Sequence, residues 1–246
     1  MRYGAWTAGL VAGLLVNCAT AAERVGLELV LLADASGSID AGEIRFQREG
    51  YAKAITDPSV LAAITQGAFG RIAVTFVEWG DASSQAVVVP WTIIDGAESA
   101  ATFASALLQT PRLAFGRNAI GSALTRARDL IESNAIDGLR KIIDLSADSA
   151  NSFGGVSLHS ARAGAAAADI TINGLAILCR QCESGRPVYY DLEAAFRETI
   201  IVGPDAFVIT ADAETQFAEA VRRKLLLEIA GRRAADWHRL AELPHN

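Results

Sequence analysis

The sequence is poor in the residue types on which much enzyme chemistry depends. It has three histidines, three lysines and three cysteines in 246 residues, and it contains no G-x-S-x-G sequence. A serine hydrolase needs a histidine base and often such a nucleophile turn. Here His159 falls on a predicted helix, and His238 and His245 lie near the C-terminus. These shortages argue against a serine hydrolase.

Positive charge is also scarce. The formal net charge is -6, and no stretch interleaves aromatic with basic residues, so the chain lacks the surface that nucleic-acid-binding proteins use. Repeats, low-complexity runs and linkers are missing as well. With 51% hydrophobic and 20% charged residues, we expect one domain over residues 24–231, followed by a surface tail over 232–246.

The N-terminus has the three regions of a secretory signal peptide. Arg2 supplies the positive region, Ala8–Val16 is the apolar region, and Ala19–Ala21 reads A-x-A. We expect residues 1–22 to be the signal peptide, with cleavage near Ala21 and Ala22. The mature chain would then be periplasmic or secreted and would carry no membrane span.

Two alternatives to cleavage are weaker. An uncleaved membrane anchor would need a longer apolar run than Ala8–Val16. Lipidation of Cys18 would need a lipoprotein box, and Asn17 is a poor residue before an acylated cysteine. We therefore favour cleavage, which removes Cys18 from the mature chain.

The two remaining cysteines form a close pair. An exported chain with an even number of cysteines favours a disulfide between Cys179 and Cys182. A redox-active C-x-x-C normally opens a helix after a strand, whereas Gly185 and Pro187 indicate a loop here. A zinc site would need two more soft ligands nearby, and none are there. We therefore expect a structural disulfide.

Hydrophobic periodicity predicts strands that alternate with helices. Strands are expected at Val25–Ala33, Arg71–Trp79, Gln85–Ile94, Leu139–Leu145, Thr171–Leu178 and Ala206–Thr210. Helices are expected at about Asp40–Thr56, Ser59–Thr65, Ser99–Leu108, Gly121–Ser133, Val156–Ala168, Asp191–Glu198 and Asp212–Ala230. This alternation predicts an α/β fold with a doubly wound, mostly parallel sheet and helices on both faces. Pro90 favours one antiparallel strand at the sheet edge.

The chemistry is concentrated at the end of the first long strand. The apolar run Leu29–Ala33 is typical of a strand buried on both faces. It is followed by Asp34, Ser36 and Ser38, whose side chains offer the oxygen atoms that a hard divalent cation prefers. Ligands of such sheets bind outside the carboxyl ends of the strands, where the strand order reverses. Asp148 follows a later strand, and it would face the same crevice if the two strands are neighbours.

Asp34-x-Ser36-x-Ser38 after a hydrophobic strand resembles the metal-ion-dependent adhesion site of von Willebrand factor A domains. The family's second motif is G-x-T-x-x-G-x-A-L, and Gly116–Leu124 matches it with Asn118 in place of the threonine. The third is an aspartate after the next strand, matched by Asp148. The chain also resembles a bacterial group of exported, single-domain A-like proteins of unassigned function.

The resemblance, which covers about Val25–Ala230, implies both a fold and a function. It implies a Rossmann-like doubly wound sheet and a protein-binding module that is not an enzyme, has no catalytic residue and is a monomer. The metal, one Mg²⁺ or Mn²⁺ ion, would engage a Glu or Asp of a partner protein. The residues implied to bind it are Asp34, Ser36, Ser38, Asn118 and Asp148. An asparagine amide oxygen can still ligate a hard cation.

The alternative is a Mg-dependent phosphoryl-transfer or hydrolytic enzyme with Asp34 at the strand end. That chemistry usually needs a lysine to balance the charge of a phosphate. Lys141 begins a predicted strand, and Lys53 and Lys224 lie on predicted helices. Since no lysine is expected at the carboxyl edge of the sheet, we favour the binding module.

Overall fold

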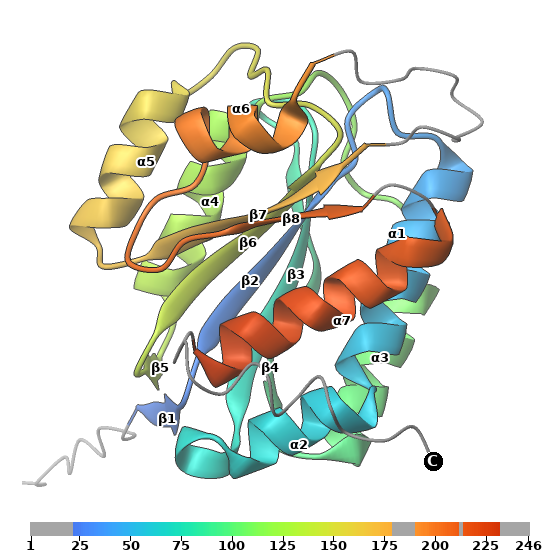
Figure 1. Cartoon of the computed structure of the whole chain (residues 1–246), viewed down its shortest axis with the longest axis vertical. Coiled ribbons are helices and arrows are strands. Elements are labelled where there is room, and N and C mark those ends of the chain that lie inside the picture. The colour runs from blue at the N-terminus through green and yellow to red at the C-terminus, as the bar shows by residue number, and fades with distance from the viewer. Residues whose placement is uncertain (1–21, 179–189, 212–213, 232–246) are drawn as a thin grey trace, which may run out of the picture.

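The computed structural model describes residues 22–178, 190–211 and 214–231, and it has the predicted α/β architecture. A six-stranded sheet has the order β4-β3-β2-β6-β7-β8, and helices cover both of its faces (Figure 1). The six strands are β2 (Glu28–Asp34), β3 (Ile72–Trp79), β4 (Gln85–Ile94), β6 (Lys141–Ala147), β7 (Thr171–Ile177) and β8 (Val208–Ala211). A short parallel pair joins β1 (Glu23–Val25) to β5 (Ile136–Gly138).

The helices alternate with these strands along the chain. The described helices are α1 (Ala41–Ile55), α2 (Pro58–Gln66), the 3₁₀ turn η1 (Ala68–Gly70), α3 (Ala97–Gln109), α4 (Ile120–Glu132), α5 (Leu158–Ala167), α6 (Leu192–Thr199) and α7 (Glu214–Ala230). One layer of helices includes α1, α3 and α7, and the other includes α4, α5 and α6 (Figure 1). No helix in the described ranges is long and apolar enough to cross a bilayer.

The strand order reverses at β2, as the prediction required. The next strand of the sheet along the chain, β3, lies parallel to β2 on one side, and β6 lies parallel on the other. Only β4 is antiparallel, and it forms the edge that Pro90 indicated. The switch point therefore lies between β2 and β6. The residues that follow these two strands therefore lie at the place where sheets of this kind bind their ligands.

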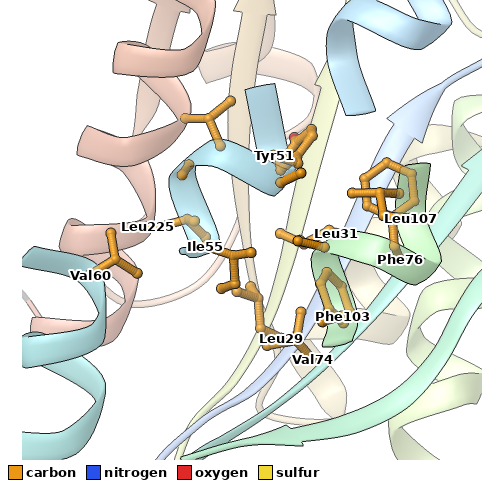
Figure 2. Packing of buried hydrophobic residues seen from close by; sticks show 14 of the residues in the cluster. Leu29, Leu31, Tyr51, Ile55, Val60, Val74, Phe76, Phe103, Leu107 and Leu225 are labelled. Atoms are coloured by element: carbon orange, nitrogen blue, oxygen red, sulfur yellow. The ribbon is translucent and has the colours of Figure 1, made fainter. Parts of the chain in front are cut away.

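β2 is buried on both faces, and all seven of its residues are buried. Leu29 and Leu31 pack into one core with Tyr51 of α1 (Figure 2). Val30 and Leu32 face the other core, beneath α4. The continuous apolar run is confirmed as a central strand, because such a strand needs hydrophobic side chains at successive positions.

α1 starts shortly after the Asp34–Ser38 stretch, and a capping box fixes its start. The amide of Glu43 donates to Asp40 Oδ1, and the amide of Asp40 donates to Glu43 Oε2, each at 2.8 Å. These two bonds satisfy donors that a helix start leaves unpaired. They set the point at which the loop after β2 turns into the helix.

Several strand boundaries differ from the prediction by one to three residues, and the first strand and β6 bear on the site. The strand expected at Val25–Ala33 is divided, because the Gly26 backbone passes so close to the Ala68 carbonyl that a Cβ would lie 2.5 Å from it. β6 runs two residues further than expected, so Asp148 follows it directly. Glu28, the first residue of β2, is fully buried and accepts hydrogen bonds from Asn134 and Gly138.

Several predicted features lie outside the described residues. They are the signal peptide, Cys18, the disulfide between Cys179 and Cys182, and the tail at 232–246. Each remains a prediction from the sequence.

Candidate metal centre

Asp34 is the last residue of β2, and its side chain is completely buried. The amide of Ser36 donates to Asp34 Oδ1 at 2.7 Å. The other oxygen, Oδ2, is buried and has no hydrogen-bond partner among the described residues. A buried carboxylate oxygen without a donor is energetically unfavourable unless a cation or a proton binds it.

The two serines of the loop after β2 lie together. Ser36 Oγ and Ser38 Oγ are 3.2 Å apart, with Ser36 buried and Ser38 half-buried. Gly37, between them, donates from its amide to the Gly116 carbonyl at 2.7 Å. The two hydroxyls therefore lie side by side. The main-chain hydrogen bond of Gly37 connects their loop to the segment that precedes α4.

Asn118 lies two residues before α4, in that same segment. Its side-chain oxygen, Oδ1, is buried and has no hydrogen-bond partner among the described residues. Its backbone carbonyl accepts from the amide of Phe153 at 2.6 Å. The segment before α4 is thus bound on one side to the loop after β2 and on the other to the loop after β6.

Asp148 directly follows β6, which pairs with β2 up to the register of Ala33 and Ser146. Burial raises the pKa of Asp34 to about 8, and repulsion from the Asp148 carboxylate adds to this shift, against hydrogen bonds from the amide and hydroxyl of Ser36 and from the backbone of Asp148. The Asp148 carboxylate therefore lies close enough to Asp34 to oppose the ionisation of Asp34. A cation between them would relieve that repulsion.

All five predicted residues come to the carboxyl edge of the sheet, from three loops that main-chain hydrogen bonds connect. Their donor atoms suit a hard divalent cation: two carboxylates, two hydroxyls and one amide oxygen. Two of these side chains have buried acceptor atoms without a donor. Within the described part of the chain, no cluster of three or more His, Cys, Asp or Glu side chains exists. A metal here would therefore rely on neutral oxygens beside Asp34 and Asp148.

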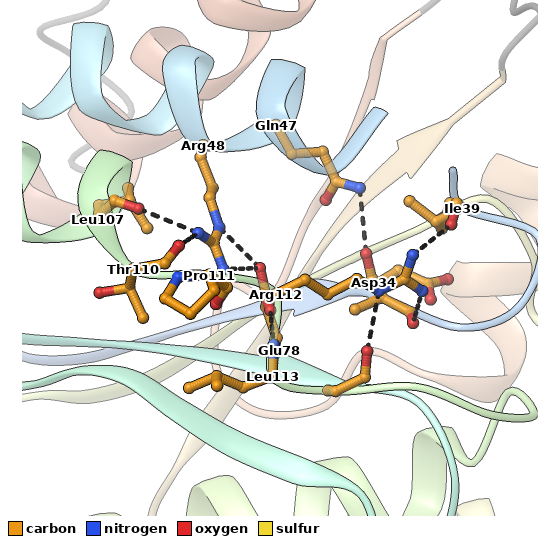
Figure 3. Close-up of polar contacts among 12 residues, drawn as sticks. Asp34, Ile39, Gln47, Arg48, Glu78, Leu107, Thr110, Pro111, Arg112 and Leu113 are labelled. Atoms are coloured by element: carbon orange, nitrogen blue, oxygen red, sulfur yellow. Dashed lines mark hydrogen bonds and ion pairs between the residues drawn. The ribbon is translucent and has the colours of Figure 1, made fainter. Parts of the chain in front are cut away.

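Arg112 is a residue of this region that the sequence analysis missed. Its guanidinium donates to the carbonyls of Ala35, Ser36 and Ile39, as Figure 3 shows in part. Arg112 therefore holds the backbone of the loop after β2 without contacting its side chains. No local pattern marks this role, because all three acceptors are main-chain atoms more than 70 positions away.

A buried ion pair holds the segment that carries Arg112. Arg48 of α1 and Glu78 of β3 approach to 2.6 Å, and both side chains are buried. Arg48 also donates to the carbonyls of Leu107, Thr110 and Pro111 (Figure 3). The pair joins α1, β3 and the end of α3 beneath the loops.

The lysines lie away from the carboxyl edge, as the sequence predicted. Lys141 is the first residue of β6, and Lys53 lies in the last turn of α1. Lys224 is buried on α7, 2.6 Å from both Asp144 and Glu228. His159 is exposed on α5. Among the described residues, therefore, no lysine or histidine lies beside Asp34.

Solved structures identify the class of fold. A von Willebrand factor type A protein from Catenulispora acidiphila is 18% identical, with a TM-score of 0.57, over 84% of this chain and 43% of that chain. Proximal thread matrix protein 1 from the mussel byssus, solved with a zinc-occupied MIDAS motif, is 18% identical, with a TM-score of 0.59, over 85% and 49%. The pilus adhesin SpaC from Lactobacillus rhamnosus GG is 15% identical, with a TM-score of 0.57, over 85% and 30%.

The chain therefore has the von Willebrand factor A fold, and it spans less than half the length of each of these three proteins. Residues 24–233 match the model of DUF1194, a family described as a protein of unknown function, and the chain belongs to that family. No curated protein sequence matches it.

Proposed function

We propose that this protein is an exported protein-binding module with a metal-ion-dependent adhesion site. Asp34, Ser36, Ser38, Asn118 and Asp148 bind one Mg²⁺ or Mn²⁺. The metal keeps an open position, and a Glu or Asp of a partner protein fills it. The module is not an enzyme.

The observation that carries the proposal is the pair of buried acceptors without donors, Asp34 Oδ2 and Asn118 Oδ1. Together with the repulsion between Asp34 and Asp148, they describe a site with buried acceptor atoms that a cation would satisfy. Protein interiors rarely keep such groups unless a ligand satisfies them. The metal-occupied motif of the mussel protein, which has the same fold, supports a divalent cation as that ligand.

The composition of the site favours a role in binding an acidic group. Two carboxylates and three neutral oxygens compensate the charge of a divalent cation only weakly if one carboxylate binds through water. Mg²⁺ retains its waters strongly and is often bound by one or two carboxylates, so an exchangeable position is expected. A carboxylate from a partner would complete both the coordination and the charge.

The sequence is the basis for our proposals on export, oligomeric state and the disulfide. We propose cleavage of residues 1–22, a periplasmic or secreted monomer, and a disulfide between Cys179 and Cys182. Intact-mass analysis of the native protein under non-reducing conditions tests the first and the last of these together. A mass that includes Met1, or two free thiols, would contradict them.

Calorimetric titration of the purified protein with Mg²⁺ and Mn²⁺ tests the metal site. We expect one ion per chain, and no binding by Asp34→Asn. Asparagine keeps an acceptor for the Ser36 amide but removes the charge, so the variant should fold as the parent does. Asp129→Asn, on the exposed side of α4, is the control and should bind as the parent does.

A parent protein that is folded by circular dichroism but binds neither ion at millimolar concentration would contradict the proposal. Equal metal affinity of Asp34→Asn and the parent would place the ion elsewhere.

A further inference from the structure

Exposed apolar side chains gather at the edge of the sheet that carries the candidate metal centre. In the described part of the chain, eight large hydrophobic residues are at least 36% exposed, and five of them belong to this edge. These five are Leu113, Phe115, Phe153, Val156 and Tyr190. A concentration of exposed apolar groups on a soluble protein indicates a binding surface.

Two of these residues adjoin the metal centre. Phe115, 56% exposed, immediately precedes Gly116, whose carbonyl binds the Gly37 amide. Phe153, 47% exposed, donates its own amide to the carbonyl of Asn118. The Phe115 ring therefore lies next to the contact between the loop after β2 and the segment before α4. The Phe153 ring lies next to the contact between that segment and the loop after β6.

An arginine guanidinium lies over each of these two aromatic rings. The guanidinium of Arg112 lies 4.8 Å from the centre of the Phe115 ring, and that of Arg117 lies 5.1 Å from the centre of the Phe153 ring. Neither arginine forms an ion pair within the described residues, whereas Arg71, at the opposite edge, pairs with Glu23 at 2.6 Å. Two positive charges without carboxylate partners thus flank the metal centre.

A recess of about 310 Å³ continues this surface past Arg112. Its lining includes Arg45, which is exposed and has no ion pair among the described residues, and Leu108, which is 50% exposed. The recess repeats the combination found at the two rings, a positive charge beside an apolar side chain. The surface therefore offers this combination at three places beside the metal centre.

We propose that the metal is surrounded by a surface that selects the partner, which we call the specificity rim. It consists of Phe115, Phe153, Arg112, Arg117 and the recess. The rim recognises an acidic protein segment in which large apolar side chains flank the metal-bound Asp or Glu. The exposed rings would bury the flanking apolar groups, and the arginines, which have no carboxylate partner among the described residues, would attract further acidic residues. This inference rests on the proposed function, because the rim acts around a metal-bound carboxylate.

The test uses a display library of heptapeptides with a fixed central Asp, selected on the full protein in Mg²⁺ and eluted with chelator. We expect enrichment of aromatic or large aliphatic residues within two positions of the Asp, and of additional Asp or Glu. Fluorescence polarisation with a selected peptide should show about tenfold weaker binding for Phe115→Ser and for Phe153→Ser. Their Mg²⁺ affinity, measured by calorimetry, should equal that of the parent.

Phe69→Ser is the matched control. Phe69 is 44% exposed, and Arg24 lies 4.6 Å from its ring, but it belongs to η1 at the opposite edge of the sheet. This variant should bind the selected peptide as the parent does. If Phe69→Ser weakens binding as much as the rim variants do, the rim is not the recognition surface.

Two further outcomes separate this inference from the proposed function. Metal-dependent peptides without flanking apolar residues, bound equally by both phenylalanine variants, would overturn the rim and leave the metal-dependent module standing. A protein that binds Mg²⁺ but selects no Asp-dependent peptide, or that instead binds polygalacturonate, would overturn the proposed protein partner and the rim with it.

Discussion

Arg112 shows how a residue outside the proposed ligand set can govern a metal site. Its guanidinium donates to three carbonyls of the loop after β2 and, through Nε, to the carbonyl of its own neighbour Ala114. The loop atoms that it holds belong to the backbone on either side of Ser36 and Ser38. Arg112 is therefore a positioning residue for the two hydroxyls.

Arg112→Ala should weaken Mg²⁺ binding by about tenfold to a hundredfold, the range typical of residues that orient metal ligands. The reason is a loss of order in the serine loop, since no ligand atom is removed. Calorimetry measures the affinity, and Arg126→Ala, an exposed arginine of α4, is the control. An unchanged affinity for Arg112→Ala would mean that the loop keeps its shape without this contact.

Replacement of Asn118 is predicted to lower the affinity for Mg²⁺ and to raise the stability of the metal-free protein. Replacing Asn118 by leucine, which has a similar shape, should weaken Mg²⁺ binding at least tenfold, because an oxygen ligand is lost. The same change should raise the free energy of unfolding of the metal-free protein by about 1 kcal/mol, because it removes a buried acceptor without a donor. Titration calorimetry and urea denaturation in the presence of chelator measure the two effects. A destabilised variant would indicate instead that the amide oxygen has a structural partner.

At the scale of elements, the ion pair of Arg48 and Glu78 determines how the end of α3 sits against α1 and β3. Arg48 binds carbonyls that the last turn of α3 leaves unpaired, and Glu78 Oε2 accepts from the amide of Leu113 at 3.3 Å. Both charges are buried, so each depends on the other for compensation.

Arg48→Met should lower the free energy of unfolding by about 3–5 kcal/mol, since it leaves the Glu78 carboxylate buried and unpaired. Arg48→Lys should restore little of this, because a lysine lacks the planar fork that reaches Glu78 and the carbonyls together. The double variant Arg48→Met with Glu78→Gln should be more stable than Arg48→Met alone. Urea denaturation measures all three, and a loss below 1 kcal/mol for Arg48→Met would contradict the expected role of the pair.

The helices and strands also show how much of the fold and of the candidate site could be predicted from the sequence. The alternation of strands and helices and the edge position of β4 follow from local patterns, and the structure confirms them. The five proposed ligands lie at the predicted edge because parallel strands end together. Arg48, Arg112 and the burial of Lys224 could not be predicted, since each depends on partners remote in sequence.

At the scale of the whole molecule, a buried charged cluster joins the neighbouring strands β6 and β7 to α7. Lys224 lies 2.6 Å from Asp144 on β6 and from Glu228 on its own helix, and Asn173 of β7 donates to Glu228 at 2.9 Å. Tyr51 of α1 also faces the cluster. One lysine accompanies two carboxyl groups, and burial raises the pKa of Glu228 to about 7, with Asp144 adding to the shift.

The raised pKa of Glu228 predicts how stability depends on pH. Between about pH 4.5 and pH 7, the folded protein holds a proton on Glu228 that the unfolded chain has released, so the folded state binds more protons. Stability should therefore fall as pH rises through this window, by on the order of 2 kcal/mol. Urea denaturation at pH 5 and pH 7.5 measures the change.

Glu228→Gln should remove most of this dependence, because a glutamine stays neutral at both pH values. Asp34 contributes in the same direction, since its pKa is raised to about 8. The comparison is therefore made in the Asp34→Asn background, with Asp129→Asn as a surface control. A pH dependence that Glu228→Gln leaves unchanged would assign it to other groups.

The main-chain bonds that connect the three site loops have a consequence for how this protein can change over generations. The bonds between Gly37 and Gly116 and between Asn118 and Phe153 use only backbone atoms. Substitution of the ligand side chains therefore leaves those connections in place. A lineage can exchange or lose the proposed ligand side chains while it inherits the same three loops as a scaffold for new contacts.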